Sequence, residues 1–130
     1  MYKVFLSSNI SGSATHSVDK PESDGIKFEA SYVQGILTMS LDEFVKLDNV
    51  AFPNHIKIDV DGHEMTIVEN MQQVLNDRRL KSVCIEIAKE LYCKGIDRLL
   101  IACGFEVYIT ETWGDEGREI ENVVFTRRGE

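Results

Sequence analysis

HIKIDVDGHE, residues 55–64, is a β-branched run that leads directly into a cluster of carboxylates, one glycine and one histidine. Ile56, Ile58 and Val60 indicate a strand, and apolar residues recur at helical spacing after Gly62. In an open α/β sheet, parallel strands place functional groups at their carboxyl ends, where the chain turns into a helix. We therefore expect any chemistry of this chain to be at Asp59 and Asp61.

A second unit of strand and helix follows. Residues 83–87 are predicted to form a buried strand, and residues 96–103 mark the inner face of a helix that Gly104 can end. Two such consecutive units imply a parallel sheet with right-handed crossovers. Residues 105–109 and 123–125 are expected to form an antiparallel hairpin around an acidic loop, residues 111–121. The predicted fold is α/β, with a mostly parallel sheet that ends in a C-terminal antiparallel hairpin.

The amino-terminal part, residues 1–39, is expected to contain short strands and a serine- and glycine-rich loop over residues 7–24. Ser40 and Glu43 then form a capping box, S-x-x-E, which predicts the start of a short helix. The apolar residues of that helix, expected to face inward, are Leu41, Phe44, Val45 and Leu47. Met65, Val68, Met71 and Leu75 predict a further helix after the first carboxylate cluster.

Composition restricts the class of protein. The 130 residues, 43% of them hydrophobic, predict a single domain, 1–130, that is small for a complete α/β enzyme. The formal charge of −8 argues against nucleic acid or a membrane surface as partner. Three cysteines without C-x-x-C spacing indicate reduced thiols. Because no membrane-length apolar run or leader is evident, we expect a cytoplasmic location.

Each residue of the carboxylate cluster has a functional and a structural interpretation. Asp59 is a candidate for orienting a nucleophile or accepting its proton, or it is a turn or capping residue. Asp61, followed by glycine, is typical of a turn or N-cap. His63 is a candidate base. Glu64 stands where a helix dipole favours an acid in any case.

Glu86 is a further candidate because it lies within the apolar run of the second strand. A carboxylate buried there is costly unless it is paired or bound. The alternative is an ion pair with a basic residue on the neighbouring strand, such as Lys57. The histidines, His16, His55 and His63, have no zinc-ligand spacing, so no metal site is predicted from them.

Several of these motifs together resemble one family. Residues 40–44 (SLDEF), 56–64 (IKIDVDGHE), 83–87 (VCIEI) and 103–105 (CGF) resemble, in order and spacing, the carboxyl-terminal half of FkbM-type S-adenosylmethionine-dependent methyltransferases. The resemblance implies a Rossmann-like sheet, S-adenosylmethionine as cofactor, and O-methylation of a small molecule or sugar. It also implies Asp59 and His63 as catalytic residues, with Asp61, Glu64 and Glu86 lining the crevice for substrate and cofactor.

The sequence departs from that family in one respect. No glycine-rich turn follows an early strand, so the chain looks like the later strands of the fold without the first ones. The strand at residues 55–60 would then be an exposed edge, which favours a homodimer that covers it. Two other classes stay open. One is a truncated, non-catalytic binding or oligomerisation module, and the other is a metal-dependent nucleotide-sugar transferase using Asp59-Val60-Asp61 as a D-x-D motif.

Overall fold

The computed structural model describes residues 2–8, 10, 16–23, 26–60, 62–88, 95–113 and 120–129. Contacts within the chain divide it into two compact units, Met1–Met39 and Ser40–Glu130, which we call the N-terminal and C-terminal units. The expectation of one domain over residues 1–130 stays a prediction.

The N-terminal unit is built around β1 (Tyr2–Leu6). β2 (His16–Val18) and β5 (Tyr32–Ile36) pair with it, both antiparallel. β3 (Glu22–Ser23) and β4 (Ile26–Lys27) form a separate two-stranded ribbon. The loop predicted over residues 7–24 therefore contains β2 and β3. β2 has no apolar pattern that predicts a strand, because its pairing with β1 depends on backbone hydrogen bonds.

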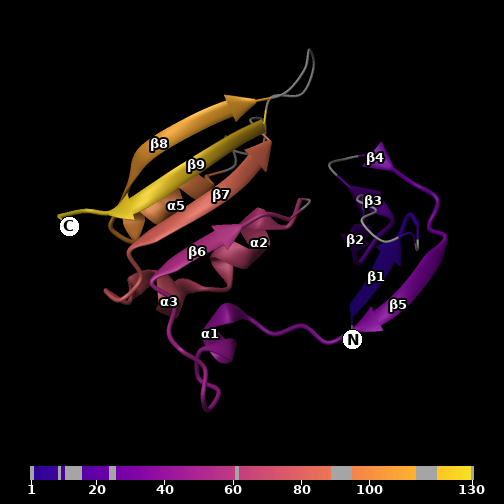
Figure 1. Ribbon diagram of the computed structural model, residues 1–130, viewed down its shortest axis with the longest axis horizontal. Coiled ribbons are helices and arrows are strands. Elements are labelled where there is room, and N and C mark those ends of the chain that lie inside the picture. Colours follow the sequence, from indigo (N-terminus) through magenta and orange to yellow (C-terminus); the bar gives the residue numbers. More distant parts are fainter. Residues whose placement is uncertain are drawn as a thin grey trace. The chain divides into compact units, whose positions relative to one another are not determined.

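The C-terminal unit contains a four-stranded sheet in the order β6-β7-β9-β8 (Figure 1). Its strands are β6 (His55–Ile58), β7 (Ser82–Ala88), β8 (Phe105–Trp113) and β9 (Ile120–Arg127). β6 pairs with β7 in parallel, whereas β9 pairs with both β7 and β8 in antiparallel register. The described part of the protein is thus mixed α/β.

The prediction of a mostly parallel sheet is not confirmed. In the C-terminal unit the β6–β7 ladder is parallel and the two ladders of β9 are antiparallel, and the sheet around β1 is antiparallel throughout. The physical reason is the position of β9. The chain returns from the hairpin and inserts β9 between β7 and β8, so it separates two strands that would otherwise be parallel neighbours. The predicted antiparallel hairpin of β8 and β9 is confirmed.

That hairpin is longer than expected. β8 continues to Trp113 across a bulge between Val107 and Ile109, and β9 begins at Ile120. Backbone pairing therefore extends into the segment that the sequence indicated as an acidic loop. The pairs Glu111 with Asn122 and Thr112 with Glu121 carry no apolar signal, yet they complete the ladder.

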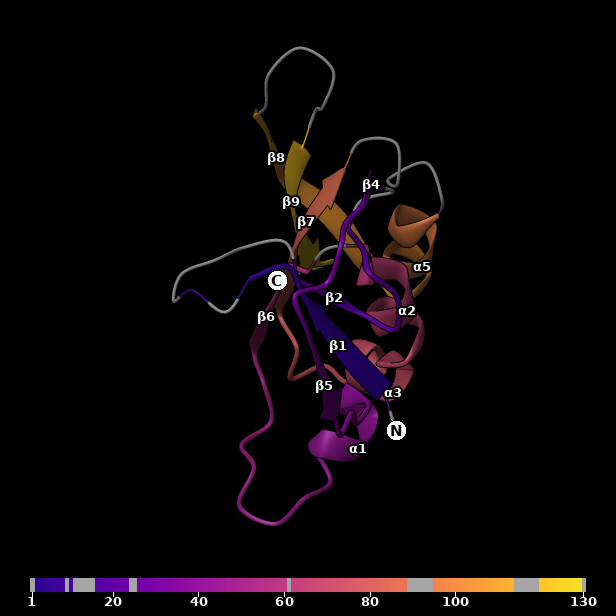
Figure 2. The ribbon, with the colours of Figure 1, turned by 90° about the vertical axis from the view of Figure 1, so that its right-hand side faces the viewer.

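The helices α2 (Glu64–Glu69), α3 (Gln72–Asn76) and α5 (Ile96–Ala102) cover one face of this sheet (Figure 2). The core lies between the two layers. Its fully buried side chains include Val83, Ile85, Ile87, Phe105 and Phe125 from the strands, and Val68, Met71, Leu75 and Leu100 from the helical layer. Within the described residues, no helix is long and apolar enough to span a membrane.

The predicted helix carrying Met65 and Leu75 is interrupted at Asn70 and Met71. The side-chain amides of Asn70 and Gln72 donate to the carbonyls of Thr66 and Val68, each at 2.8 Å. Side chains that bond locally to the backbone compete with helix hydrogen bonds. The predicted apolar face is nevertheless confirmed, because all four of its residues belong to the core or pack against it.

The short helix α1 (Leu41–Phe44) begins as the capping box predicts. The Glu43 N–H donates to Ser40 Oγ, and the Ser40 hydroxyl donates to the Glu43 carboxylate, both at 3.2 Å. Leu41 packs against the core, but Phe44 and Leu47 are each 47% exposed. The expectation that all apolar residues of α1 face inward was wrong, because the helix ends after one turn.

Candidate functional site

The candidate site is the segment that links β6 to α2. We call residues 59–64 the strand-end segment; Asp61 lies outside the described residues. β6 is the terminal strand of its sheet, and β7 is its hydrogen-bonded neighbour. The strand-end segment therefore leaves the carboxyl end of a parallel pair, which is where open α/β sheets place ligands.

Asp59 is exposed at this edge and paired with Lys57. The Lys57 ammonium donates to Asp59 Oδ2 at 2.6 Å, and the two side chains are 59% and 53% exposed. Residues i and i+2 of a strand share one face, which explains the pairing. The hydrogen bond and the charge of Asp59 raise the pKa of Lys57. Asp59 is thus a solvent-accessible carboxylate with a fixed cation beside it.

Glu86 lies on β7, in the same sheet. Ile85 and Ile87 on either side of it are buried, whereas Glu86 is half-buried and projects to the other face. The expectation of a costly buried carboxylate was wrong for this reason. The predicted ion pair with Lys57 is also replaced, because Lys57 pairs with Asp59. The charge of Glu86 still contributes, after Asp59, to raising the pKa of Lys57.

His63 and Glu64 begin α2. His63 is the N-cap residue, is half-buried, and makes no capping hydrogen bond with its side chain. Glu64 is only 5% exposed, and among the described residues it is the one charged residue that is buried. Its Oε1 accepts the Gly62 N–H at 3.0 Å. The structure therefore brings Asp59, His63 and Glu64 onto one short segment, with Glu64 turned inward.

Gly62 is the residue that allows the chain to turn here. Its φ is +84°, a region that side chains with a Cβ rarely adopt. Its N–H also donates to the carbonyl oxygen of Val60 at 3.1 Å. From the sequence, this glycine marks only the change from strand to helix. A glycine shortly after a strand and just before a helix was the signal for its backbone role.

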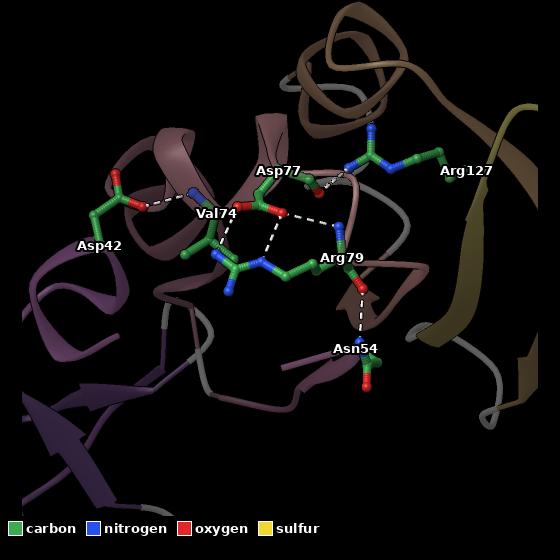
Figure 3. Close-up of polar contacts among 6 residues, drawn as sticks. All are labelled: Asp42, Asn54, Val74, Asp77, Arg79 and Arg127. Atoms are coloured by element: carbon green, nitrogen blue, oxygen red, sulfur yellow. Dashed lines mark hydrogen bonds and ion pairs between the residues drawn. The ribbon is translucent and has the colours of Figure 1, made fainter. Parts of the chain in front are cut away.

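The acid of the LDEF motif has a structural role in this fold. Asp42 accepts the backbone N–H groups of Gln73 and Val74 at 3.0 and 2.9 Å, as Figure 3 shows for Val74. These are free donors in the first turn of α3, so Asp42 caps a helix more than 30 residues away in sequence. Nothing local in the sequence could reveal this cap, because the two elements meet only in the tertiary structure.

A second set of polar contacts lies around Asp77 (Figure 3). The Arg79 guanidinium donates to both carboxylate oxygens of Asp77, at 3.1 and 2.8 Å, and lowers the pKa of Asp77 to about 2. The same guanidinium stacks on the Phe52 ring at 3.8 Å. The Asn54 side chain donates to the Arg79 carbonyl at 2.9 Å. These contacts tie the segment before β6 to the segment before β7, so they support the sheet rather than the site.

Among the residues that the structure describes, no three His, Cys, Asp or Glu side chains gather closely enough to hold a metal ion. Of the two acids of the D-x-D motif, Asp59 is among the described residues and Asp61 lies outside them. The described contact of Asp59 is with a lysine ammonium, which competes with a cation for the carboxylate.

Comparison with known proteins gives a consistent result. Residues 2–107 match the methyltransferase FkbM domain. A hexuronic acid methyltransferase, AglP from Haloferax volcanii, is 31% identical over 112 residues, which are 86% of this chain and 42% of AglP. This chain thus spans less than half the length of that relative. No solved structure matches significantly. Since the family match covers most of the chain, the protein belongs to the FkbM methyltransferase domain family.

Proposed function

We propose that this chain contributes to methyl transfer from S-adenosylmethionine to an oxygen of a sugar or other small molecule. The observation that carries the proposal is the FkbM domain match over residues 2–107. The relative named for methylation of a hexuronic acid supports a sugar as the acceptor. AglP is more than twice as long as the matched region, so its name does not establish the activity of this chain. The activity, the methyl acceptor and the partners of this chain are therefore proposals.

The C-terminal unit fits the later half of a Rossmann-like sheet. β6 and β7 form its parallel pair, and β6 is the strand beside which the first strand of such a fold would lie. The exposed carboxylate of Asp59 directly follows β6, and the half-buried Glu86 lies on β7. The two carboxylates outnumber the Lys57 ammonium, so negative charge remains there that suits a sulfonium cation, and the residues present fit one side of a cofactor site.

S-adenosylmethionine, when bound, supplies a methyl group that is already activated for attack. The protein then has to align the acceptor hydroxyl and receive its proton. In this proposal Asp59 accepts a hydrogen bond from the acceptor hydroxyl, with Lys57 holding the carboxylate in place. His63, whose side chain is not used as a cap, takes the proton as the carbon–oxygen bond forms. Glu86, on β7, is proposed to line the crevice for substrate and cofactor, and the same role is proposed for Asp61, which lies outside the described residues.

The test is calorimetric titration of the purified chain with S-adenosylmethionine and with its demethylated product. We expect micromolar binding of both, weakened at least fivefold in Asp59→Asn and unchanged in Glu69→Gln, an exposed carboxylate at the end of α2. A folded chain that binds neither compound would contradict the proposal. It would favour the alternative of a non-catalytic binding module.

The homodimer stays a proposal as well. β6 is the terminal strand of its sheet and contributes the partly buried Ile56 and the buried Ile58, which suits pairing with a second copy. A monodisperse monomer in light scattering at high protein concentration would contradict the homodimer. A cytoplasmic location is proposed on the free thiols Cys84 and Cys103, since reduced cysteines are usual there.

A further inference from the structure

The buried carboxylate of Glu64 is the feature that the proposed function leaves unexplained. Glu64 is 5% exposed, so it does not present its carboxylate to solvent as Asp59 does. Removing a carboxylate from water is costly unless it accepts strong hydrogen bonds. An apolar residue at this position would pack against the same core without that cost. Its retention in the fold therefore needs a reason other than packing.

The contact with Gly62 supplies that reason. Glu64 Oε1 accepts the Gly62 N–H at 3.0 Å, and the same N–H also donates to the Val60 carbonyl at 3.1 Å. One donor is thus shared by a backbone carbonyl and by the buried carboxylate. The bond to Glu64 ties the Gly62 backbone to a side chain of α2, whereas the bond to Val60 links it only to the neighbouring backbone.

Glu64 is itself fixed by the core. It opens α2, and Val68, one turn later on the same helix, is fully buried, while Met65 and Ile67 pack against the core. The position of the Glu64 carboxylate is therefore set by the packing of α2 on the sheet. Through Gly62, that packing also determines how the chain leaves β6.

We propose that Glu64 is a positioning residue that holds the Gly62 backbone where Asp59 and His63, on either side of it in the chain, can act together. It works through the Gly62 backbone and does not contact substrate. The inference rests on the proposed function, since it concerns the same site. Glu64, the first residue of α2, then positions the site, and His63 accepts the proton.

The experiment compares three variants by their affinity for S-adenosylmethionine at a temperature where far-UV circular dichroism shows each to be folded. Glu64→Leu removes the acceptor, and we expect at least a tenfold loss of affinity. Glu64→Gln keeps an acceptor oxygen for Gly62, so we expect a loss below threefold. Glu69→Leu, an exposed position on the same helix, should have no effect. A residue needed only for stability would lower the melting temperature and leave the affinity of the folded protein unchanged.

Two results would overturn the inference. One is unchanged affinity in folded Glu64→Leu, and the other is an equal loss in Glu64→Gln, which would mean that the charge itself acts on the ligand. A wild-type chain without affinity would refute the proposed function, and the inference would then be judged by NMR of the free protein. We expect the Gly62 amide to exchange at least tenfold faster in Glu64→Leu but not in Glu64→Gln. Equal exchange in all three proteins would refute the positioning role.

Discussion

Arg127 connects several segments of the C-terminal unit, and its replacement is our principal prediction. At the end of β9, its guanidinium donates to the backbone carbonyls of Leu75, Asp77, Leu80 and Cys103, at 2.8, 2.9, 2.9 and 3.2 Å. It also lies over the Phe105 ring at 4.3 Å. Carbonyls at helix ends have no partner within the helix. The single guanidinium of Arg127 therefore donates to carbonyls at the C-terminal ends of both α3 and α5.

The magnitude follows from these contacts. A hydrogen bond to a charged group contributes about 1.5–3 kcal/mol, so four taken independently would give about 6–12 kcal/mol. The four share one side chain and are not additive, and the partly buried carbonyls recover some hydration when the arginine is lost. We therefore expect Arg127→Leu to lose about 3–5 kcal/mol of the free energy of unfolding. This is a large share of the roughly 5–15 kcal/mol typical of a domain.

Urea denaturation followed by far-UV circular dichroism measures this loss by linear extrapolation. Arg128→Leu is the matched control, because Arg128 is 57% exposed and its ion pair with Glu106 is 4.0 Å long. We expect that control to change the free energy by about 0.5 kcal/mol or less. A loss below about 1 kcal/mol in Arg127→Leu, or equal losses in the two variants, would refute the reasoning.

Two further predictions concern the contacts in Figure 3. Asp42→Ala should lower the free energy of unfolding by about 1–2 kcal/mol, because it removes the cap of α3, and Asp42→Asn should recover part of that loss in the same denaturation assay. The second prediction concerns the loss of stability at acidic pH. Arg79 lowers the pKa of Asp77 from 3.8 to about 2, so the folded state releases this proton more readily than the unfolded state. The stabilisation is therefore complete above about pH 4 and is lost as the pH falls towards 2. The stability difference between wild type and Asp77→Asn should shrink over that range, and a difference independent of pH would contradict it.

Much of the C-terminal unit was predictable because its signals are local. The β-branched residues around Ile58 and Ile85 predicted β6 and β7, and both strands are present. The capping box at Ser40 marked the start of α1, and Gly104, with φ of +88°, follows the end of α5 as expected. The order in which these motifs occur also carried the family resemblance, which the domain match confirms.

The candidate site was predictable only in part. The sequence placed Asp59, His63 and Glu64 at a strand end, and the structure puts them after β6. The pairing of Asp59 with Lys57 could have been foreseen, since the two residues share a face of the strand. The burial of Glu64 could not have been foreseen, because it depends on how α2 packs against the sheet.

The sequence alone determined the identity of the main strands, the position of the acidic strand end and the family, because periodicity, caps and motif order act over a few residues. Only the tertiary structure decided that β9 lies between β7 and β8, that Asp42 caps α3 and that Arg127 joins the ends of two helices. The contacts of Asp42 and Arg127 connect residues 24 to 52 positions apart. A contact of that kind depends on which elements meet in the folded chain, and no local pattern of side chains encodes it.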